Sequence, residues 1–295
     1  MSMIAQASQE NVKPHGGARV LASLGWPGLL LSLAVIGLYV PVFVDINPLW
    51  HNERGGHCIF ILPLAIGLAW LRRDQLKEVE LKPDVRGLWL IGLGLACEVV
   101  SFLFRMAFLE AYTMVPVLAG LVLLCAGRRA LSILAFPILM MIFIVPFPNL
   151  IISPVSQWIS VQSANGSVGA MQLLGYPIAQ DGNIIHLHGG VEVVVADVCS
   201  GFNKLSILFI MSLIYGDMFP LAPWRRVLLT VSALPIALVS NILRITIILL
   251  VSNYSGDHGL HVVHDWAELI VVVIAFFFFL GLGTLLGCKR PRFSV

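Results

Sequence analysis

The sequence has 295 residues, of which 58% are hydrophobic and 12% are charged. A soluble domain carries about 25% charged residues, so this chain has too little charge to cover a surface that faces water. Its mean hydropathy of +0.92 therefore excludes an ordinary soluble domain and indicates a membrane protein. The net charge of +2 excludes little, because the positions of the Lys and Arg residues matter more than their sum.

Long apolar windows recur along almost the whole chain. A helix that crosses a membrane needs about 20 apolar residues, and eight windows approach this length: 28–45, 56–71, 87–104, 108–126, 130–147, 200–219, 227–250 and 265–287. We therefore expect an all-α polytopic membrane protein with about eight transmembrane helices. Residues 1–27 lack a signal-peptide cleavage site and are expected to form a cytoplasmic tail, followed by a single multi-pass membrane domain, 28–295.

The basic residues predict the orientation of these spans. With a cytoplasmic N-terminus, 14 of the 18 Lys and Arg residues fall in cytoplasmic segments, and such segments are normally rich in Lys and Arg. Both termini are then cytoplasmic, and the outer face receives Arg54 and Arg105. Lys204 and Arg244 remain, and both lie within spans, where a charged residue marks function more often than not.

The longest segment between spans, 148–199, is expected outside the membrane and contains no Lys or Arg. Over 151–174 it has four apolar residues at helical spacing, Ile152, Val155, Trp158 and Ile159. This spacing, among polar residues, predicts a short helix on the outer surface.

A small β-hairpin is predicted after this helix and before the sixth span. Its strands are expected at 183–188 and 191–195, because turn signals precede them, at Asp181-Gly182 and Gly189-Gly190. Gly-containing pairs of this kind favour tight turns between strands.

Cys199 stands where the hairpin leads into the sixth span. The positive end of a helix dipole lowers the pKa of a thiol at a helix start and so favours the reactive thiolate. The alternative is a disulfide with Cys58, which an oxidising compartment would permit.

Two further reactive groups are expected at the same depth. Arg244 follows Arg226 by 18 residues, about 27 Å of helix, which brings its guanidinium to the outer boundary; Asn241 lies on the same face, one turn deeper. His264 precedes Lys289 by 25 residues, about 37 Å, and so lies at the outer interface. The alternative roles for Arg244 are snorkelling to the interface and an ion pair with Glu98.

These residues resemble the signature of the exosortase/archaeosortase family of integral-membrane, cysteine transpeptidase-like enzymes. The resemblance is carried by Val193–Gly201, which contains Cys199, by Ser240–Ile245, which contains Arg244, and by His264-Asp265. It implies Cys199 as nucleophile, Arg244 as stabilising cation and His264 as proton carrier. Asn241 is a supporting candidate, and either Asp197 or Asp265 would orient the imidazole. The chain departs from the family pattern at 202–204 and at Glu268.

The resemblance also implies partners and a location. Family members act on exported proteins that carry a C-terminal sorting tail, which consists of a Pro-containing motif, a hydrophobic helix and a basic cluster. The expected location is the bacterial cytoplasmic (inner) membrane, with the active site on the outer face and lipid around the spans. We expect no cofactor, no metal and no nucleic-acid partner.

Two other functions remain open from the residues. The first is a metal site, because paired histidines are natural ligands of Zn or Cu. Seven of the eight histidines are expected outside, and five of these are closely spaced: His186, His188, His258, His261 and His264. Gly259 favours a loop there, which weakens a helical ligand set. The second is a transporter or lipid-handling protein that uses Arg244, Lys204 and Glu98 along a pathway.

Overall fold

The computed structural model describes residues 16–51, 55–182, 184–186, 192–194 and 202–288. For residues 16–29, 31, 32, 107, 192, 194 and 254–265 the description covers the backbone alone. The chain divides into two compact units, Met1–Val145 and Pro146–Val295, which we call the N-unit and the C-unit. The prediction of one membrane domain over 28–295 stays a prediction.

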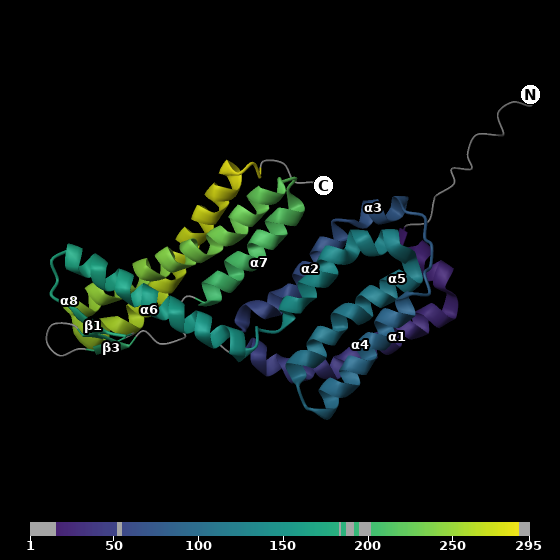
Figure 1. The fold of residues 1–295 in the computed structure, drawn as a ribbon, viewed down its shortest axis with the longest axis horizontal. Helices are drawn as coiled ribbons and strands as arrows, with labels where there is room; N and C mark the ends of the chain where they lie inside the picture. The colour runs from purple at the N-terminus through teal and green to yellow at the C-terminus, as the bar shows by residue number, and fades with distance from the viewer. Residues whose placement is uncertain (1–15, 52–54, 183, 187–191, 195–201, 289–295) are drawn as a thin grey trace, which may run out of the picture. The chain divides into compact units, whose positions relative to one another are not determined.

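The described part of the N-unit is helical (Figure 1). Its elements are α1 (Gly16–Trp50), the 3-10 helix η1 (Gly56–Phe60), α2 (Ile61–Trp70), α3 (Arg73–Glu78), α4 (Gly87–Leu103), α5 (Ala107–Met140) and the 3-10 helix η2 (Met141–Ile144). Helix α1 begins 12 residues before the expected span, at Gly16 rather than residue 28. Backbone hydrogen bonds can extend a helix beyond the apolar residues that define a span, which explains the difference.

Helices α4 and α5 pack closely through glycines. A side chain at Gly87 would meet the backbone of Gly120 and Leu124, and one at Gly120 would meet the backbone of Gly87 and Ile91. Gly127 interrupts α5 with a φ of 86°, in the left-handed region that glycine tolerates. The interruption separates the two windows expected at 108–126 and 130–147, so this boundary was predicted correctly.

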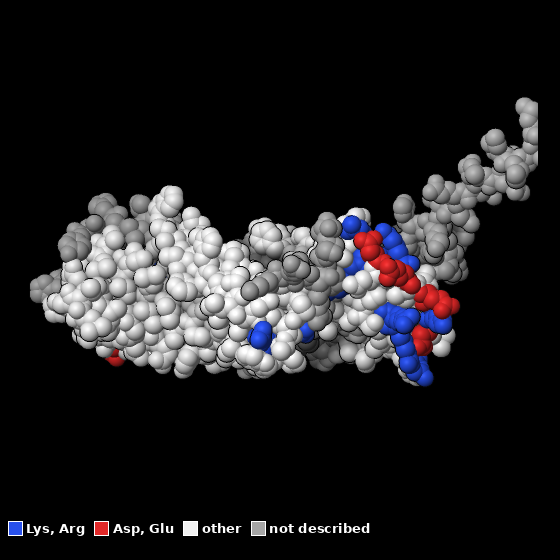
Figure 2. Space-filling view, turned by 90° about the horizontal axis from the view of Figure 1, so that it is seen from above, with Lys and Arg blue, Asp and Glu red and all other residues white. Residues whose placement is uncertain are grey.

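Charged residues gather at one end of the N-unit, where Figure 2 shows blue and red atoms close together. Two of its ion pairs are Arg128 Nε with Asp84 Oδ2, at 3.0 Å, and Lys82 Nζ with Glu80 Oε2, at 3.0 Å. One pocket at this end is lined by Arg128, Arg129 and Lys82, among other residues. The segments expected in the cytoplasm after the second and fourth windows therefore meet at the same end of this unit.

The C-unit contains α6 (Asn149–Leu173), β1 (Ala179–Asp181), β2 (Ile184–His186), β3 (Glu192–Val194), α7 (Phe202–Met218) and α8 (Pro223–Leu285). The expected hairpin is present as β2 and β3, in which Ile185 pairs with Val193. Strand β1 was not predicted; it pairs with β2 across a turn in which Gly182 has a φ of 60°. Ile178 and Ile185 pack against Ile245 and Leu249 of α8.

The helix predicted over 151–174 is present as α6, whereas its position on the outer surface stays a prediction. Ile152 and Ile159 are buried, and Trp158 is exposed. Four serines share the buried face, Ser156, Ser160, Ser163 and Ser167. Small side chains allow close helix packing, and Gly166 of this helix lies directly against Ile242 of α8.

Helix α8 consists of two arms that lie side by side. Arg225 Nη1 donates a hydrogen bond of 3.0 Å to the carbonyl of Leu286, and Leu229, Ala233 and Ala237 share a core with Phe279. The chain therefore reverses direction between Asn253 and Trp266, the limits of the two apolar arms. A loop was expected at Gly259, but its backbone is helical, so the reversal joins two helical segments through a sharp bend.

Within the described residues, four helices are long and apolar enough to cross a membrane: Leu33–Trp50, Phe108–Ile144, Pro223–Asn253 and Trp266–Leu285. Gly56–Trp70 and Gly87–Leu103 are apolar but shorter. A mostly helical membrane protein is thus confirmed, whereas the count of eight spans is not. The count differs because several apolar windows form short helices or parts of a longer one.

Candidate functional site

A buried group of charged side chains lies in the C-unit, where the two arms of α8 meet α7. Arg244 Nη2 is 2.6 Å from Glu268 Oε2. Lys204 Nζ, from the first turn of α7, is 3.9 Å from the other oxygen of the same carboxylate. We call Arg244, Glu268 and Lys204 the charge cluster. One carboxylate therefore contacts two cations from different helical segments.

Asn241 and α6 extend this cluster. Lys204 Nζ donates a hydrogen bond of 3.4 Å to Asn241 Oδ1, and Asn241 Nδ2 donates one of 3.0 Å to Ser163 Oγ. Ser167 Oγ donates to the backbone carbonyl of Ile242 at 3.1 Å. Three helices thus contribute side chains to one connected polar network inside an apolar unit.

The burial of the cluster is uneven. The side chains of Arg244 and Lys204 are 2% and 4% exposed, whereas that of Glu268 is 44% exposed. Removing a cation from water is costly unless an opposite charge and further hydrogen bonds accompany it. Glu268 and Asn241 supply part of this compensation. The cluster therefore contains two buried cations that both contact one partly exposed carboxylate.

The structure locates the predicted site residues to different extents. It brings Arg244 and Asn241 together on one buried face of α8, as expected. His264 and Asp265 lie within the helical backbone of α8, but their side chains are outside the described atoms. Cys199 and Asp197 lie outside the described residues. The assignments of these residues as a catalytic site stay predictions.

Glu268 was missed as a partner of Arg244. The alternative that we considered for Arg244 was an ion pair with Glu98, but the carboxylate in contact is that of Glu268. Glu98 instead accepts a hydrogen bond of 2.5 Å from Thr113 Oγ1. The sequence did contain a signal, because Glu268 is an acidic residue inside an apolar window and such residues mark partners or function.

The described residues test the competing metal and disulfide hypotheses only in part. Among the side chains that are described, no three His, Cys, Asp or Glu residues come together as a metal site. His186 is half-buried on β2, and the other four histidines of the metal hypothesis lie outside these side chains. Cys58 is a buried thiol of the N-unit, and Cys199 lies outside the described residues, so the disulfide between them stays a hypothesis.

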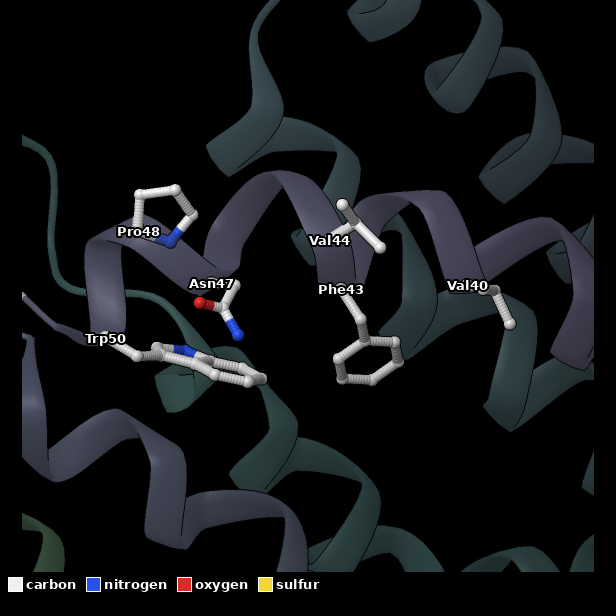
Figure 3. Close-up of a pocket in the computed structure, with 6 residues that line it drawn as sticks. All are labelled: Val40, Phe43, Val44, Asn47, Pro48 and Trp50. Atoms are coloured by element: carbon white, nitrogen blue, oxygen red, sulfur yellow. The ribbon is translucent and has the colours of Figure 1, made fainter.

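One groove in the described part of the N-unit has a mostly apolar lining. A surface groove of about 500 Å³ follows the end of α1, and its lining residues are Val40, Phe43, Val44, Asn47, Pro48 and Trp50. Figure 3 shows the rings of Phe43 and Trp50 on the same side of the helix, with centroids 6.1 Å apart. Asn47 is its one amide side chain, so this groove offers no nucleophile or acid.

Comparison with known proteins gives one match. The family model described as "Transmembrane exosortase (Exosortase_EpsH)" matches residues 49–281. The match includes both arms of α8, the charge cluster and the three predicted catalytic residues. Neither the comparison with curated proteins nor that with solved structures finds a match.

Proposed function

The chain belongs to the transmembrane exosortase family, and from this premise we propose that it is a membrane-embedded cysteine peptidase or transpeptidase. Its substrates are exported proteins with a C-terminal sorting tail, which it cleaves at the outer face of the cytoplasmic membrane. Cys199, Arg244 and His264 carry the reaction, and Asn241 supports Arg244. Asp197 or Asp265 orients the imidazole.

The observation that best supports this site is the convergence of three segments on Glu268. Lys204 follows Cys199 by five residues, and Glu268 follows His264 by four. Lys204 and Arg244 each contact Glu268, at 3.9 Å and 2.6 Å. In a helix, four residues make about one turn, or 6 Å of rise. The described neighbours of the proposed nucleophile and proton carrier thus gather around the proposed cation.

The proposed reaction proceeds through an acyl-enzyme. The thiolate of Cys199 attacks the carbonyl carbon of the scissile peptide, and the guanidinium of Arg244 stabilises the resulting oxyanion. The C–N bond breaks as the imidazolium of His264 protonates the leaving amine, which leaves a thioester. Water or an acceptor amine then attacks the thioester, gives its proton to His264 and releases the Cys199 thiolate.

The distribution of charge supports the proposed orientation. Arg225 and Leu286 lie together at one end of the C-unit, and Arg226 and Lys289, basic residues expected in the cytoplasm, are close to them in the sequence. Met171, Ile178 and Ile185 pack around Ile245 and Leu249, about 30 Å further along the first arm of α8 by its rise per residue. Arg244 of the charge cluster is next to Ile245 in the sequence, so the cluster lies at the end of the C-unit opposite Arg225. We assign this end to the outer face.

The nucleophile is tested by co-expressing Cys199→Ala with a reporter that carries the sorting tail of an exported protein from the same genome. We expect the uncleaved reporter to accumulate, whereas Cys97→Ala, a matched cysteine change in α4, leaves cleavage unchanged. Cleavage at the normal rate by Cys199→Ala would sink the assignment. Trapping of a thioester by hydroxylamine in the wild type, and its absence in the variant, gives a second readout.

A further inference from the structure

We propose that Glu268 is a positioning residue of this site: its carboxylate fixes the two arms of α8 and the start of α7 relative to one another, and so holds Arg244 in its reactive place. The inference rests on the proposed function for its catalytic consequence. Its geometric part, a link between three segments through one carboxylate, stands on contacts among described residues.

The contacts divide the carboxylate between two cations. Oε2 of Glu268 lies 2.6 Å from Arg244 Nη2, which is a short, charge-assisted contact. Oε1 lies 3.9 Å from Lys204 Nζ, a longer ion pair. Glu268 lies on the second arm of α8, Arg244 on the first arm and Lys204 on α7. Each oxygen thus joins the second arm to a different segment.

Two buried cations share this carboxylate. Arg244 and Lys204 are almost completely buried, where like charges repel more strongly than in water. Asn241 offers an uncharged acceptor to Lys204 at 3.4 Å, which does not neutralise it. Loss of the negative charge at Glu268 therefore removes the carboxylate that both cations contact and strengthens the net repulsion between them, which favours movement of either side chain.

Movement of Arg244 is expected to affect the chemical step more than substrate binding. A misplacement of about 1 Å costs roughly 100-fold in rate when a group acts in the transition state. The carboxylate itself does not enter the reaction as proposed. We therefore expect a lower kcat with little change in KM when Glu268 loses its charge.

The first experiment measures cleavage of a synthetic sorting-tail peptide by purified variants in detergent. Glu268→Gln keeps the shape of the side chain and removes its charge, and we expect kcat to fall by about 100-fold with KM within about twofold. Glu268→Asp keeps the charge on a stem one methylene shorter, and we expect it to recover at least about tenfold of the loss. An unchanged kcat per folded molecule in Glu268→Gln overturns the proposal.

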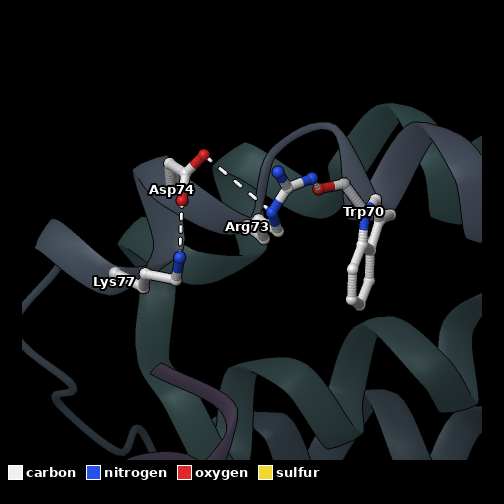
Figure 4. Close-up of polar contacts among 4 residues, drawn as sticks. All are labelled: Trp70, Arg73, Asp74 and Lys77. Carbon is white, nitrogen blue, oxygen red and sulfur yellow. Dashed lines mark hydrogen bonds and ion pairs between the residues drawn. The ribbon is translucent and has the colours of Figure 1, made fainter. Parts of the chain in front are cut away.

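A matched control exists in the N-unit, where Asp74 also contacts two cations. Its Oδ1 is 2.6 Å from Lys77 Nζ and its Oδ2 is 4.0 Å from Arg73 Nε (Figure 4). All three side chains are exposed; the hydrogen bond from Lys77 is the main cause that lowers the pKa of Asp74. Asp74→Asn removes the same charge from a similar group that water screens, and we expect kcat to stay unchanged.

The second experiment needs no substrate. Glu268→Gln is expected to lower Tm by on the order of 5 °C, because it removes the charge of a half-exposed carboxylate that contacts two buried cations. Lys204→Met then costs less in this background than in the wild type, since it removes one of the two cations that shared this carboxylate. Glu80→Gln and Lys82→Met change an exposed pair and should combine additively. Additive Tm shifts for Glu268→Gln and Lys204→Met also overturn the proposal.

The two experiments separate this inference from the proposed function. If Cys199→Ala still cleaves the peptide, the proposed function fails, and non-additive Tm shifts would still support the link between the segments. If Cys199→Ala is inactive and Glu268→Gln retains the wild-type kcat, the function stands and the positioning role is wrong.

Discussion

Arg244 and Glu268 lie 24 positions apart within α8, yet their side chains are 2.6 Å apart. An unbroken straight helix would separate them by about 36 Å. The hydrogen bond from Arg225 to the carbonyl of Leu286 has the same midpoint along the chain, near residue 256. Two contacts with one midpoint show that the arms run antiparallel in a fixed register, which places Glu268 opposite Arg244.

The antiparallel arms predict which segments of the C-unit share a side of the membrane. The strand region after α6 packs near Ile245 and Leu249, whereas Arg225 and Leu286 mark the other end of the arms. We expect alkaline phosphatase inserted after Gly175 to be active outside the cell. The same enzyme fused after Cys288 should be inactive. Equal activity of the two fusions would contradict the orientation.

Arg244 gives a second prediction, because its planar group can form contacts that an ammonium cannot. Arg244→Lys should reduce peptide cleavage by about 100-fold, the scale of one lost oxyanion donor, and Arg244→Ala by at least as much. The measurement is the single-turnover rate of the purified variants. Arg128→Lys is the matched control, since Arg128 also pairs with a carboxylate, at 3.0 Å, but is 65% exposed. A rate of Arg244→Lys within about threefold of the wild type would contradict the role of the guanidinium.

Depth arithmetic on the sequence identifies Arg244 and Asn241 correctly as neighbours on one face of a helix, because both belong to one regular element. Their partners could not be found in this way. Glu268 reaches Arg244 only because α8 reverses, and Lys204 comes from another helix. Both partners lie at positions identified from the sequence as departures from the family pattern, 202–204 and 268. Lys204 and Glu268 contact each other there, at 3.9 Å.

The packing of α4 on α5 gives a third prediction. Gly87→Ala would place a methyl group against the backbone of Gly120 and Leu124, and backbone atoms cannot move aside cheaply. We expect a loss of about 1–3 kcal/mol in the free energy of unfolding, typical of overpacking.

Gly92→Ala is the control on the same helix, because no atom lies within 4 Å of the added carbon. Alanine is a better helix former than glycine, so the stability of this variant should not fall. Denaturation in mixed micelles measures both variants, and equal stability would contradict the close contact.

The sequence pattern predicted α6 as a helix but did not indicate which of its residues pack inside the C-unit. Trp158 belongs to the apolar face that the spacing defines, whereas the helix buries a row of serines and leaves Trp158 exposed. Serines can replace apolar residues here because their hydroxyl groups find acceptors, as Ser167 does at the carbonyl of Ile242. Hydrophobicity alone does not reveal such partners, since they depend on which helix packs alongside.

The contact between α6 and α8 gives the last prediction. Asn241 is completely buried, and its Nδ2 donates to Ser163 Oγ at 3.0 Å. Ser163→Ala removes this acceptor, and we expect a loss of about 1–3 kcal/mol in the free energy of unfolding, the cost of a buried donor without its acceptor. Asn241→Leu alone should also destabilise. The double variant should lose less than both changes summed, because neither polar group remains to be satisfied.

Ser132→Ala is the control, since that hydroxyl is exposed and donates within its own helix to the carbonyl of Arg129. Strictly additive losses at Ser163 and Asn241 would show that the two side chains do not depend on each other.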